Sequence, residues 1–313
     1  MIQVAVLDDY QGVALTSADW SPLAGKANVT VFRDHLADED ALVERLAPFA
    51  VVCAMRERTP LRRSLLARLP NLRLIASTAP RNAAIDMAAA SELGIEVRHT
   101  GYSSNGAIEL TWALILAAAR HVPAETNSVR AGGWMTGVGV DLAGATLGIA
   151  GLGRIGGAAA RIAKAFDMNV IAWSTNLTAE RAEEAGARLV SKEALFRESD
   201  FVTLQLVLSE RSRHTVAAAE LALMKPTAWL VNSSRGPLVD EGALIDALTR
   251  GTIAGAALDT YEVEPLPAGH PFRTLPNVIA MPHVGFVTKN TYAVFYGDTV
   301  RNVADWIASG SHA

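Results

Sequence analysis

The sequence predicts an α/β fold built from two doubly wound parallel-sheet domains, and three observations support this prediction. The chain has 313 residues, which is long enough for two domains that each bury a core. Short apolar, β-branched runs alternate with alanine-rich helical stretches almost throughout, as in βαβ units. These runs fall into two series, separated by a strongly apolar helical stretch and the glycine-rich segment Ala131–Trp134.

Each series corresponds to the strands of one parallel sheet. The first series comprises Val4–Leu7, Val29–Phe32, Val51–Ala54, Leu72–Ala76 and Ile95–Arg98. The second comprises Thr146–Ala150, Asn169–Trp173, Phe201–Leu206, Ala228–Asn232, Gly255–Leu258 and Val278–Ala280. Helical patterns lie between the strands, among them Asp38–Leu46 and Ile85–Leu93.

The two series define a discontinuous domain and an inserted one. The chain after Gly285 is helical in pattern and has no further strand, so we expect it to pack back on the first domain. The predicted domains are therefore residues 1–98 with 286–313, and residues 99–285 between them. The stretch Ile108–His121 marks the crossing, and apolar residues surround nearly the whole of it, including Trp112, Leu114, Ile115 and Leu116. A helix of this kind must be buried in a core or against another subunit.

Composition and charge exclude several classes of partner. A net charge of −4 provides no electrostatic footprint for nucleic acid. No apolar run approaches the roughly 20 residues of a membrane helix, and the first residues show no basic region or cleavage site of a signal peptide. The single cysteine, Cys53, excludes an intramolecular disulfide and a cysteine zinc cluster, which suits a reducing cytoplasm. We expect a cytoplasmic globular enzyme or binding protein with no metal site.

A glycine-rich loop begins the second series. The segment Gly151–Gly156 fits the pattern G-x-G-x-x-G, follows the predicted strand Thr146–Ala150 and opens an alanine-rich helix. This is the context of a dinucleotide-binding loop. The alternative is a structural glycine turn in a doubly wound domain that binds no nucleotide.

Each residue of this loop has a predicted role. Gly151 makes the tight turn, Gly153 lets a pyrophosphate approach the backbone, and Gly156 lets the helix pack closely on the strand. The amides of Arg154 and Ile155, at the start of the helix, face the phosphates. The sequence therefore predicts a dinucleotide bound at this loop.

The residue that would select the cofactor departs from the usual pattern. In NAD-binding domains an acid about 20 residues beyond the glycines holds the ribose 2′-hydroxyl. Here Asn169–Trp173 is followed by Ser174, Thr175 and Asn176. No carboxylate repels a 2′-phosphate, and no adjacent arginine attracts one, the nearest being Arg181. We expect both NAD(H) and NADP(H) to be accepted, with a slight preference for NADP(H).

Three polar residues, Arg235, Glu264 and His283, each come shortly after a strand of the second series. In open α/β sheets, ligands bind beyond these carboxyl ends. Taken singly, such residues are usually solvated or cap a turn. Together, opposite a dinucleotide loop, they suit the reduction of a 2-oxo acid. His283 supplies the proton, Glu264 keeps it charged and oriented, and Arg235 binds the carboxylate and polarises the carbonyl.

The chain resembles the D-isomer-specific 2-hydroxyacid dehydrogenases, a family that includes glyoxylate and hydroxypyruvate reductases and phosphoglycerate dehydrogenases. The matching stretches are Gly151–Gly156, Asn232–Glu241, Ala257–Pro265 and Pro282-His283, with a looser match at Ile108–Thr111. The resemblance covers essentially the whole chain. It implies a Rossmann-like cofactor domain inserted into a discontinuous, flavodoxin-like substrate domain, and a homodimer formed largely through the cofactor domains.

The resemblance also implies roles for individual residues. Arg235, Glu264 and His283 would be the catalytic set. Asp259 would contact the nicotinamide end of the cofactor, and Ser233 would lie beside it. Glu264 argues against the formate dehydrogenase branch, which resembles this pattern but carries glutamine there.

Some loops depart from the family's pattern. A glycine-rich loop of the first domain often holds the substrate carboxylate with its amides, but here Ala79 adds a Cβ and Pro80 has no N–H to donate. The segment Gln205–Val207 stands where the family has His-Leu-Pro, near the nicotinamide ribose. In related enzymes, the loop that carries Arg56 and Arg58 faces the distal end of the substrate. Either arginine would favour a second anionic or polar group, and a solvated charged loop is the alternative.

We therefore expect an NAD(P)-dependent oxidoreductase that interconverts a small D-2-hydroxy acid and its 2-oxo acid, of the glyoxylate, hydroxypyruvate or 3-phosphoglycerate type. The alternative is a dinucleotide-sensing binding protein that resembles the corepressors of the same fold. The expected partners are a small anionic acid and a second copy of the chain, in a homodimer that uses the Ile108–His121 region.

Overall fold

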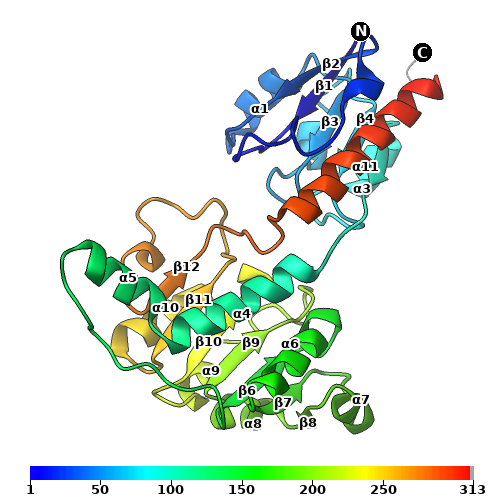
Figure 1. The fold of residues 1–313 in the computed structure, drawn as a ribbon. Coiled ribbons are helices and arrows are strands. Elements are labelled where there is room, and N and C mark those ends of the chain that lie inside the picture. The colour runs from blue at the N-terminus through cyan, green and yellow to red at the C-terminus, as the bar shows by residue number, and fades with distance from the viewer. Residues whose placement is uncertain (311–313) are drawn as a thin grey trace. The chain divides into compact units, whose positions relative to one another are not determined.

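The computed structural model describes residues 1–310, which divide into two compact units (Figure 1). Unit 1 consists of Met1–Ser103 and the segment that begins at Val287, and unit 2 consists of Ser104–Phe286. The boundaries expected from the sequence, 98/99 and 285/286, lie five residues and one residue before the observed ones.

Unit 1 contains a five-stranded parallel sheet. Its strands are β1 (Ile2–Val6), β2 (Ala27–Val31), β3 (Val51–Ala54), β4 (Leu74–Ser77) and β5 (Glu96–His99). Their order is β2-β1-β3-β4-β5, the order of flavodoxin-like sheets. The helices are α1 (Glu39–Leu46), α2 (Arg63–Leu66), α3 (Met87–Glu92) and the C-terminal α11 (Lys289–Ala308), with a 3₁₀ turn, η1 (Ser21–Leu23). Helix α11 packs against β4, β5 and η1, so the end of the chain returns to the first sheet.

Unit 2 contains a seven-stranded parallel sheet. Its strands are β6 (Thr146–Ala150), β7 (Asn169–Trp173), β8 (Arg188–Leu189), β9 (Phe201–Leu204), β10 (Trp229–Asn232), β11 (Gly255–Leu258) and β12 (Val278–Ala280). The strand order is β12-β11-β10-β9-β6-β7-β8. The chain first adds strands on one side of β6, up to β8, and then on the other side, from β9 to β12, as in Rossmann domains. The predicted fold class, two doubly wound parallel-sheet domains, is confirmed.

Helices cover both faces of the unit 2 sheet. The helices of unit 2 are α4 (Asn105–Ala119), α5 (Val122–Arg130), α6 (Arg154–Ala165), α7 (Ala179–Glu184), α8 (Lys192–Glu198), α9 (Ala218–Leu223) and α10 (Glu241–Arg250), with 3₁₀ turns η2 (Gly236–Leu238) and η3 (Pro271–Arg273). Successive strand residues face opposite sides, so Leu230 of β10 packs in one apolar cluster with α8, α9 and α10. Its neighbour Val231 packs in the other, with α4 and α6. This two-sided burial explains why the strands read as continuous apolar runs.

The helix expected at Ile108–His121 begins earlier and ends sooner than predicted. Helix α4 ends at Ala119 because His121, with φ of 51°, adopts a left-handed conformation and precedes α5. Helix α4 packs on α6, β10 and β11, so it belongs to unit 2. Of its large apolar side chains, Trp112 and Ile115 are buried and Leu116 is exposed. Neither α4 nor any other helix of residues 1–310 is both long and apolar enough to cross a membrane.

Candidate active site

The glycine-rich loop joins the carboxyl end of β6 to α6. Gly151 has φ of 100°, and a Cβ there would lie 2.6 Å from the carbonyl oxygen of Gln205, beyond the end of β9. A Cβ at Gly156 would overlap the carbonyl oxygen of Gly151. Only glycine fits at either position, so α6 starts directly against the end of the strand, as the sequence predicts for a tight turn and close packing.

The mouth of this loop is open. Gly153 is the N-cap of the twelve-residue helix α6, no side chain caps the helix, and nothing lies within 4 Å of a Cβ built on Gly153. No side chain therefore occupies the first-turn amides of α6, including those of Arg154 and Ile155, as a cap. Such a cradle fits the pyrophosphate of a dinucleotide, because the amides and the helix dipole both favour negative charge.

At the end of β7 the structure leaves a neutral loop. Ser174 is half-buried, and Thr175 and Asn176 are exposed. Arg181 lies in the first turn of α7, where its N–H donates to the hydroxyl of Thr178, the helix N-cap. The adenosine ribose would thus meet a hydroxyl here and no carboxylate.

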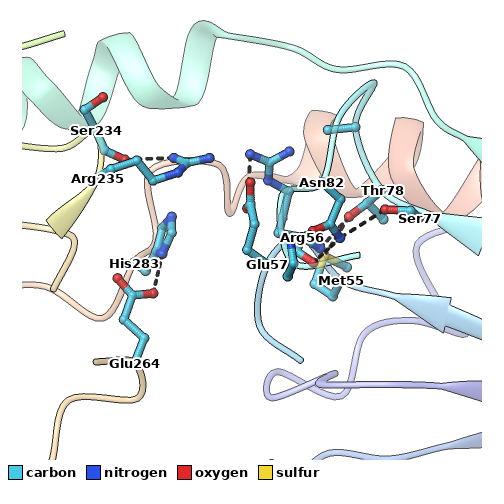
Figure 2. Close-up of polar contacts among 12 residues, drawn as sticks. Met55, Arg56, Glu57, Ser77, Thr78, Asn82, Ser234, Arg235, Glu264 and His283 are labelled. Carbon is cyan, nitrogen blue, oxygen red and sulfur yellow. Dashed lines mark hydrogen bonds and ion pairs between the residues drawn. The ribbon is translucent and has the colours of Figure 1, made fainter. Parts of the chain in front are cut away.

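The two residues assigned to acid catalysis are in direct contact (Figure 2). His283, after β12, places Nδ1 2.6 Å from Oε2 of Glu264, after β11. The other carboxylate oxygen, Oε1, accepts a hydrogen bond of 2.9 Å from the N–H of Tyr261. Glu264 is therefore fixed by its own loop and engages one nitrogen of the imidazole. The second nitrogen, Nε2, makes no hydrogen bond within the described part of the chain and can exchange a proton with a substrate.

A buried aspartate holds the turn that presents His283. Oδ1 and Oδ2 of Asp259 accept hydrogen bonds of 2.8 Å each, from the N–H groups of Val284 and Gly285. Asp259 is fully buried, and this burial raises the pKa of its carboxyl while the two N–H donors lower it. His283 itself has φ of 53°, an uncommon left-handed conformation that these bonds support.

Arg235 lies in the loop between β10 and η2. Its Nη1 donates a hydrogen bond of 2.8 Å to the carbonyl oxygen of Ser234 (Figure 2). The carbonyl oxygen of Arg235 accepts a hydrogen bond of 2.9 Å from Nδ2 of the buried Asn232. A Cβ on Gly236 would overlap the carbonyl group of Tyr261. The loop of Arg235 is therefore packed directly against the loop of Glu264, so the three predicted catalytic residues come from adjoining loops at one edge of the sheet.

A small polar network joins α4 to the loops after β9 and β10. The hydroxyls of Thr111 and Ser233 lie 2.7 Å apart, and Nε2 of Gln205 lies 3.4 Å from each. The same amide nitrogen donates 3.0 Å to the hydroxyl of Thr203. Gln205, in place of the family's histidine, thus ties together two loops that border the predicted cofactor site.

In unit 1, Arg56 is built into two loops. Its N–H donates 2.7 Å to Oγ1 of Thr78, and its carbonyl accepts 2.6 Å from Nδ2 of Asn82 (Figure 2). The guanidinium lies 3.4 Å from the carboxylate of Glu57 and 5.6 Å from the ring centre of Tyr102. These contacts fix the position of Arg56, so it is not a freely solvated side chain.

In the loop after β4, Ala79 and Pro80 offer no free N–H. Ala79 is buried with φ of 67°, and its N–H donates 2.8 Å to Oγ1 of Thr100. Pro80 has no N–H. Any contact between Ala79 and a substrate must therefore involve an atom other than its amide.

Sequence reasoning missed several of these residues. Tyr261 and Gly236 gave no signal of their own, because their importance depends on how two loops pack. Asp259 was assigned to the cofactor only through the family resemblance, and its bonds to the amides of Val284 and Gly285 depend on a turn that only the fold reveals.

The fold and the site define a dinucleotide-binding α/β protein with a histidine–glutamate pair. Residues 112–285 match the family model described as D-isomer specific 2-hydroxyacid dehydrogenase, NAD binding domain. The chain therefore belongs to the D-isomer specific 2-hydroxyacid dehydrogenase family, whose members are NAD(P)-dependent oxidoreductases that interconvert 2-hydroxy acids and 2-oxo acids.

Individual relatives agree with this assignment. A glyoxylate reductase of Aeropyrum pernix is 45% identical over 237 residues, which cover 72% of this chain and 71% of that protein. A D-3-phosphoglycerate dehydrogenase of Methanocaldococcus jannaschii is 40% identical over 255 residues, which cover 80% of this chain but only 48% of that longer protein. The crystal structure of a phosphoglycerate oxidoreductase from Vibrio cholerae is 38% identical, with a TM-score of 0.94 over 99% of this chain and 100% of that one. These relatives favour an enzyme over the alternative of a dinucleotide-sensing binding protein.

Proposed function

We propose that the protein reduces a small 2-oxo acid, such as glyoxylate or hydroxypyruvate, to the D-2-hydroxy acid at the loops of Arg235, Glu264 and His283. The main support for this proposal is the 2.6 Å contact between Nδ1 of His283 and Oε2 of Glu264, because the loop of Glu264 packs against the loop of Arg235. A glyoxylate reductase among the relatives supports the smaller substrates, and the phosphoglycerate enzymes support a 3-phosphoglycerate type.

The chemistry follows from the side chains. When bound, the nicotinamide cofactor supplies or accepts the hydride. His283 donates the proton from Nε2 to the carbonyl oxygen, and in the reverse direction Nε2 accepts the hydroxyl proton. The carboxylate of Glu264 stabilises the imidazolium and fixes the ring. Arg235 binds the substrate carboxylate and polarises the carbonyl through its planar guanidinium.

The cofactor is proposed to bind along the carboxyl edge of the unit 2 sheet. The loop Gly151–Gly156 holds the pyrophosphate, with the amides of Arg154 and Ile155 as donors. Ser233 and Asp259 lie at the nicotinamide end, where Asp259 would use the lone pairs that its bonds to the loop amides leave.

Ser174 is the proposed determinant of cofactor choice. Its hydroxyl can bond either a ribose hydroxyl or a 2′-phosphate, and no acid on the same loop repels the phosphate. We expect NADH and NADPH both to be used, with a slight preference for NADPH. The absence of an adjacent arginine keeps this preference small.

In unit 1, Arg56 and the Ala79 loop are proposed to contact the substrate. Arg58, the other arginine of the same loop, donates 2.7 Å to the carbonyl of Asp8 and lies 4.5 Å from the ring centre of Tyr10. Since Arg58 supports the loop in this way, Arg56 is the better candidate for a second anionic or polar group of the substrate.

We also propose that the protein is a cytoplasmic homodimer. Unit 2 exposes apolar side chains on α4, α5 and the segment after α5: Leu116, Val122, Val129, Trp134, Met135, Val138 and Val140. Exposed apolar patches of this kind usually mark interfaces. The chain has a single cysteine, Cys53, and so forms no intramolecular disulfide, which suits a reducing compartment. Sedimentation should give a dimer at micromolar concentration, and a monomer would contradict the proposal.

The experiment that tests the function is a panel of 2-oxo acids with each reduced cofactor. Glyoxylate, hydroxypyruvate, pyruvate and 3-phosphohydroxypyruvate are mixed with the protein and NADH or NADPH, and cofactor absorbance is followed. At least one small 2-oxo acid should be reduced with either cofactor. Tight dinucleotide binding without turnover of any acid would instead support the binding protein.

A further inference from the structure

A second histidine–carboxylate pair joins the loop that carries Glu264 to the start of helix α10. Oε1 of Glu241, the first residue of α10, lies 2.9 Å from Nε2 of His270, the N-cap of η3. Both side chains are largely covered, with exposed fractions of 24% and 14%. A purely structural explanation is that His270 only caps the three-residue turn that follows it.

The proton positions distinguish this pair from the catalytic one. The N–H of Phe272 donates 3.3 Å to Nδ1 of His270, so Nδ1 is an acceptor and the ring proton is on Nε2, facing Glu241. Both nitrogens of His270 are therefore occupied within the protein. In His283 only Nδ1 is occupied. The second pair cannot exchange a proton with a substrate, and its function must be one of position.

Glu241 binds the loop at two places, one on each side of Glu264. Oε1 engages His270, and Oε2 accepts a hydrogen bond of 3.2 Å from the N–H of Glu262. Glu264 lies between these two attachment points and is itself oriented by the N–H of Tyr261. One carboxylate on a rigid helix thus fixes both ends of the segment that presents the partner of His283.

Aromatic packing connects the same groups. The ring of His270 lies 4.8 Å from the ring of the buried Phe272, and Phe272 lies 6.3 Å from Tyr261. The hydroxyl of Tyr261 donates 2.8 Å to the carbonyl of Met281, two residues before His283. A displacement of His270 would therefore shift Tyr261, which contacts the segments of both Glu264 and His283.

We propose that Glu241 is a positioning residue for the reaction, which clamps the loop between residues 262 and 270 so that Glu264 stays against His283. The inference rests on the proposed function of that pair. Without the clamp, Glu264 spends part of its time away from the imidazole and no longer holds and stabilises the imidazolium.

Charged groups surround both pairs. Glu264 and Asp259 face His283, and Arg235 lies on the adjoining loop (Figure 2). The Glu241–His270 pair has Glu262 beside it, whose carboxylate pairs with Arg213 at 3.0 Å on the surface. Arg273 donates to the carbonyls of Leu266 and Pro267, within the same loop. The exposed Arg213–Glu262 pair offers a control, because surface ion pairs contribute little.

Two substitutions of His270 separate clamping from capping. His270→Gln places an amide nitrogen near the position of Nε2, so it still donates to Glu241 but no longer accepts from Phe272. His270→Asn places an oxygen near the position of Nδ1, so it still caps the turn but does not reach Glu241. Glu241→Ala removes both attachments, and Arg213→Ala removes only the exposed ion pair.

Three quantities are measured in the full-length variants: the pH profile of kcat/KM for the best 2-oxo acid, the Kd for NADH, and the downfield proton resonance of the His283 Nδ1–H bond. Glu241→Ala and His270→Asn should lower kcat/KM about tenfold and move the high-pH limb of its profile to lower pH. Both should broaden or lose the resonance, with Kd for NADH unchanged. His270→Gln and Arg213→Ala should match the parent in all three.

The opposite pattern would overturn the proposal. If His270→Asn matches the parent while His270→Gln is impaired, His270 only caps the turn. A parental pH profile and resonance in Glu241→Ala would equally remove the clamp. The resonance needs no substrate, so a parent protein that turns over no 2-oxo acid would refute the proposed function and still leave the clamp to be judged by the resonance.

Discussion

The backbone of Gly236 lies against the carbonyl group of Tyr261 with no room for a side chain between them. Gly236 follows Arg235 in sequence, and the N–H of Tyr261 holds the carboxylate of Glu264. This one contact therefore sets the spacing between the group proposed to bind the substrate and the group that supports its acid.

Gly236→Ala should damage the site more than the fold. The new Cβ overlaps Tyr261, so the two loops must separate, at a cost of about 1–3 kcal/mol in the free energy of unfolding. We expect kcat/KM to fall by more than roughly tenfold, since a small misplacement of catalytic groups is costly. Gly297→Ala, in α11 with nothing within 4 Å of its Cβ, is the matched control and should leave activity unchanged. Equal kinetics in the two variants would show that the spacing is unimportant.

Glu264→Gln should retain activity but change its pH dependence. The glutamine oxygen can still accept the N–H of Tyr261, while the negative charge beside His283 is lost. A carboxylate favours the imidazolium, and reduction needs the protonated form, so the high-pH limb of kcat/KM should move to lower pH. An unchanged profile would mean that the two side chains are not coupled.

Arg235→Lys should impair both binding and turnover. Lysine offers a point charge, whereas the planar guanidinium can hold a carboxylate and touch the carbonyl oxygen at once. We expect kcat/KM to fall by roughly 30-fold, about 2 kcal/mol, with KM raised and kcat lowered. Parental kinetics in the lysine variant would remove Arg235 from the substrate site.

Ser174→Asp should turn the preference towards NADH. An aspartate accepts bonds from the ribose hydroxyls and repels a 2′-phosphate, whereas the parent should discriminate by no more than about tenfold, or 1.4 kcal/mol. Comparison of kcat/KM for NADH and NADPH tests this, with Ser174→Ala as the control that removes the hydroxyl without adding charge. A parent that prefers NADH by a thousandfold would show that another feature rejects the phosphate.

Much of the fold could be predicted because both sheets are parallel and covered on two sides. Strands such as Val51–Ala54 and Gly255–Leu258 are buried along their whole length and therefore appear as short apolar runs. Strand β8, Arg188–Leu189, was not predicted, because two residues at the edge of a sheet are too few to form a hydrophobic pattern in the sequence. Helix α5 was also missed, since its nine residues have no buried side chain to create an apolar stripe.

The candidate site could be predicted only in part. Arg235, Glu264 and His283 stand out because each is polar and follows a strand end. The bonds that orient them involve backbone groups, such as the N–H of Tyr261 on Glu264. The amide of Ala79 gives a further example, since its bond to Thr100 joins residues 21 positions apart. Backbone partners carry no mark in the sequence, so these supports appear only once the loops are folded.

The central claim is that His283 donates the proton in reduction of a 2-oxo acid, and His283→Ala tests it most directly. Initial rates with glyoxylate and hydroxypyruvate are compared with the Kd for NADH in parent and variant. The account predicts that kcat falls by at least about 100-fold, as expected for a lost general acid, while the Kd for NADH changes little. Turnover near the parental rate in the variant would contradict it.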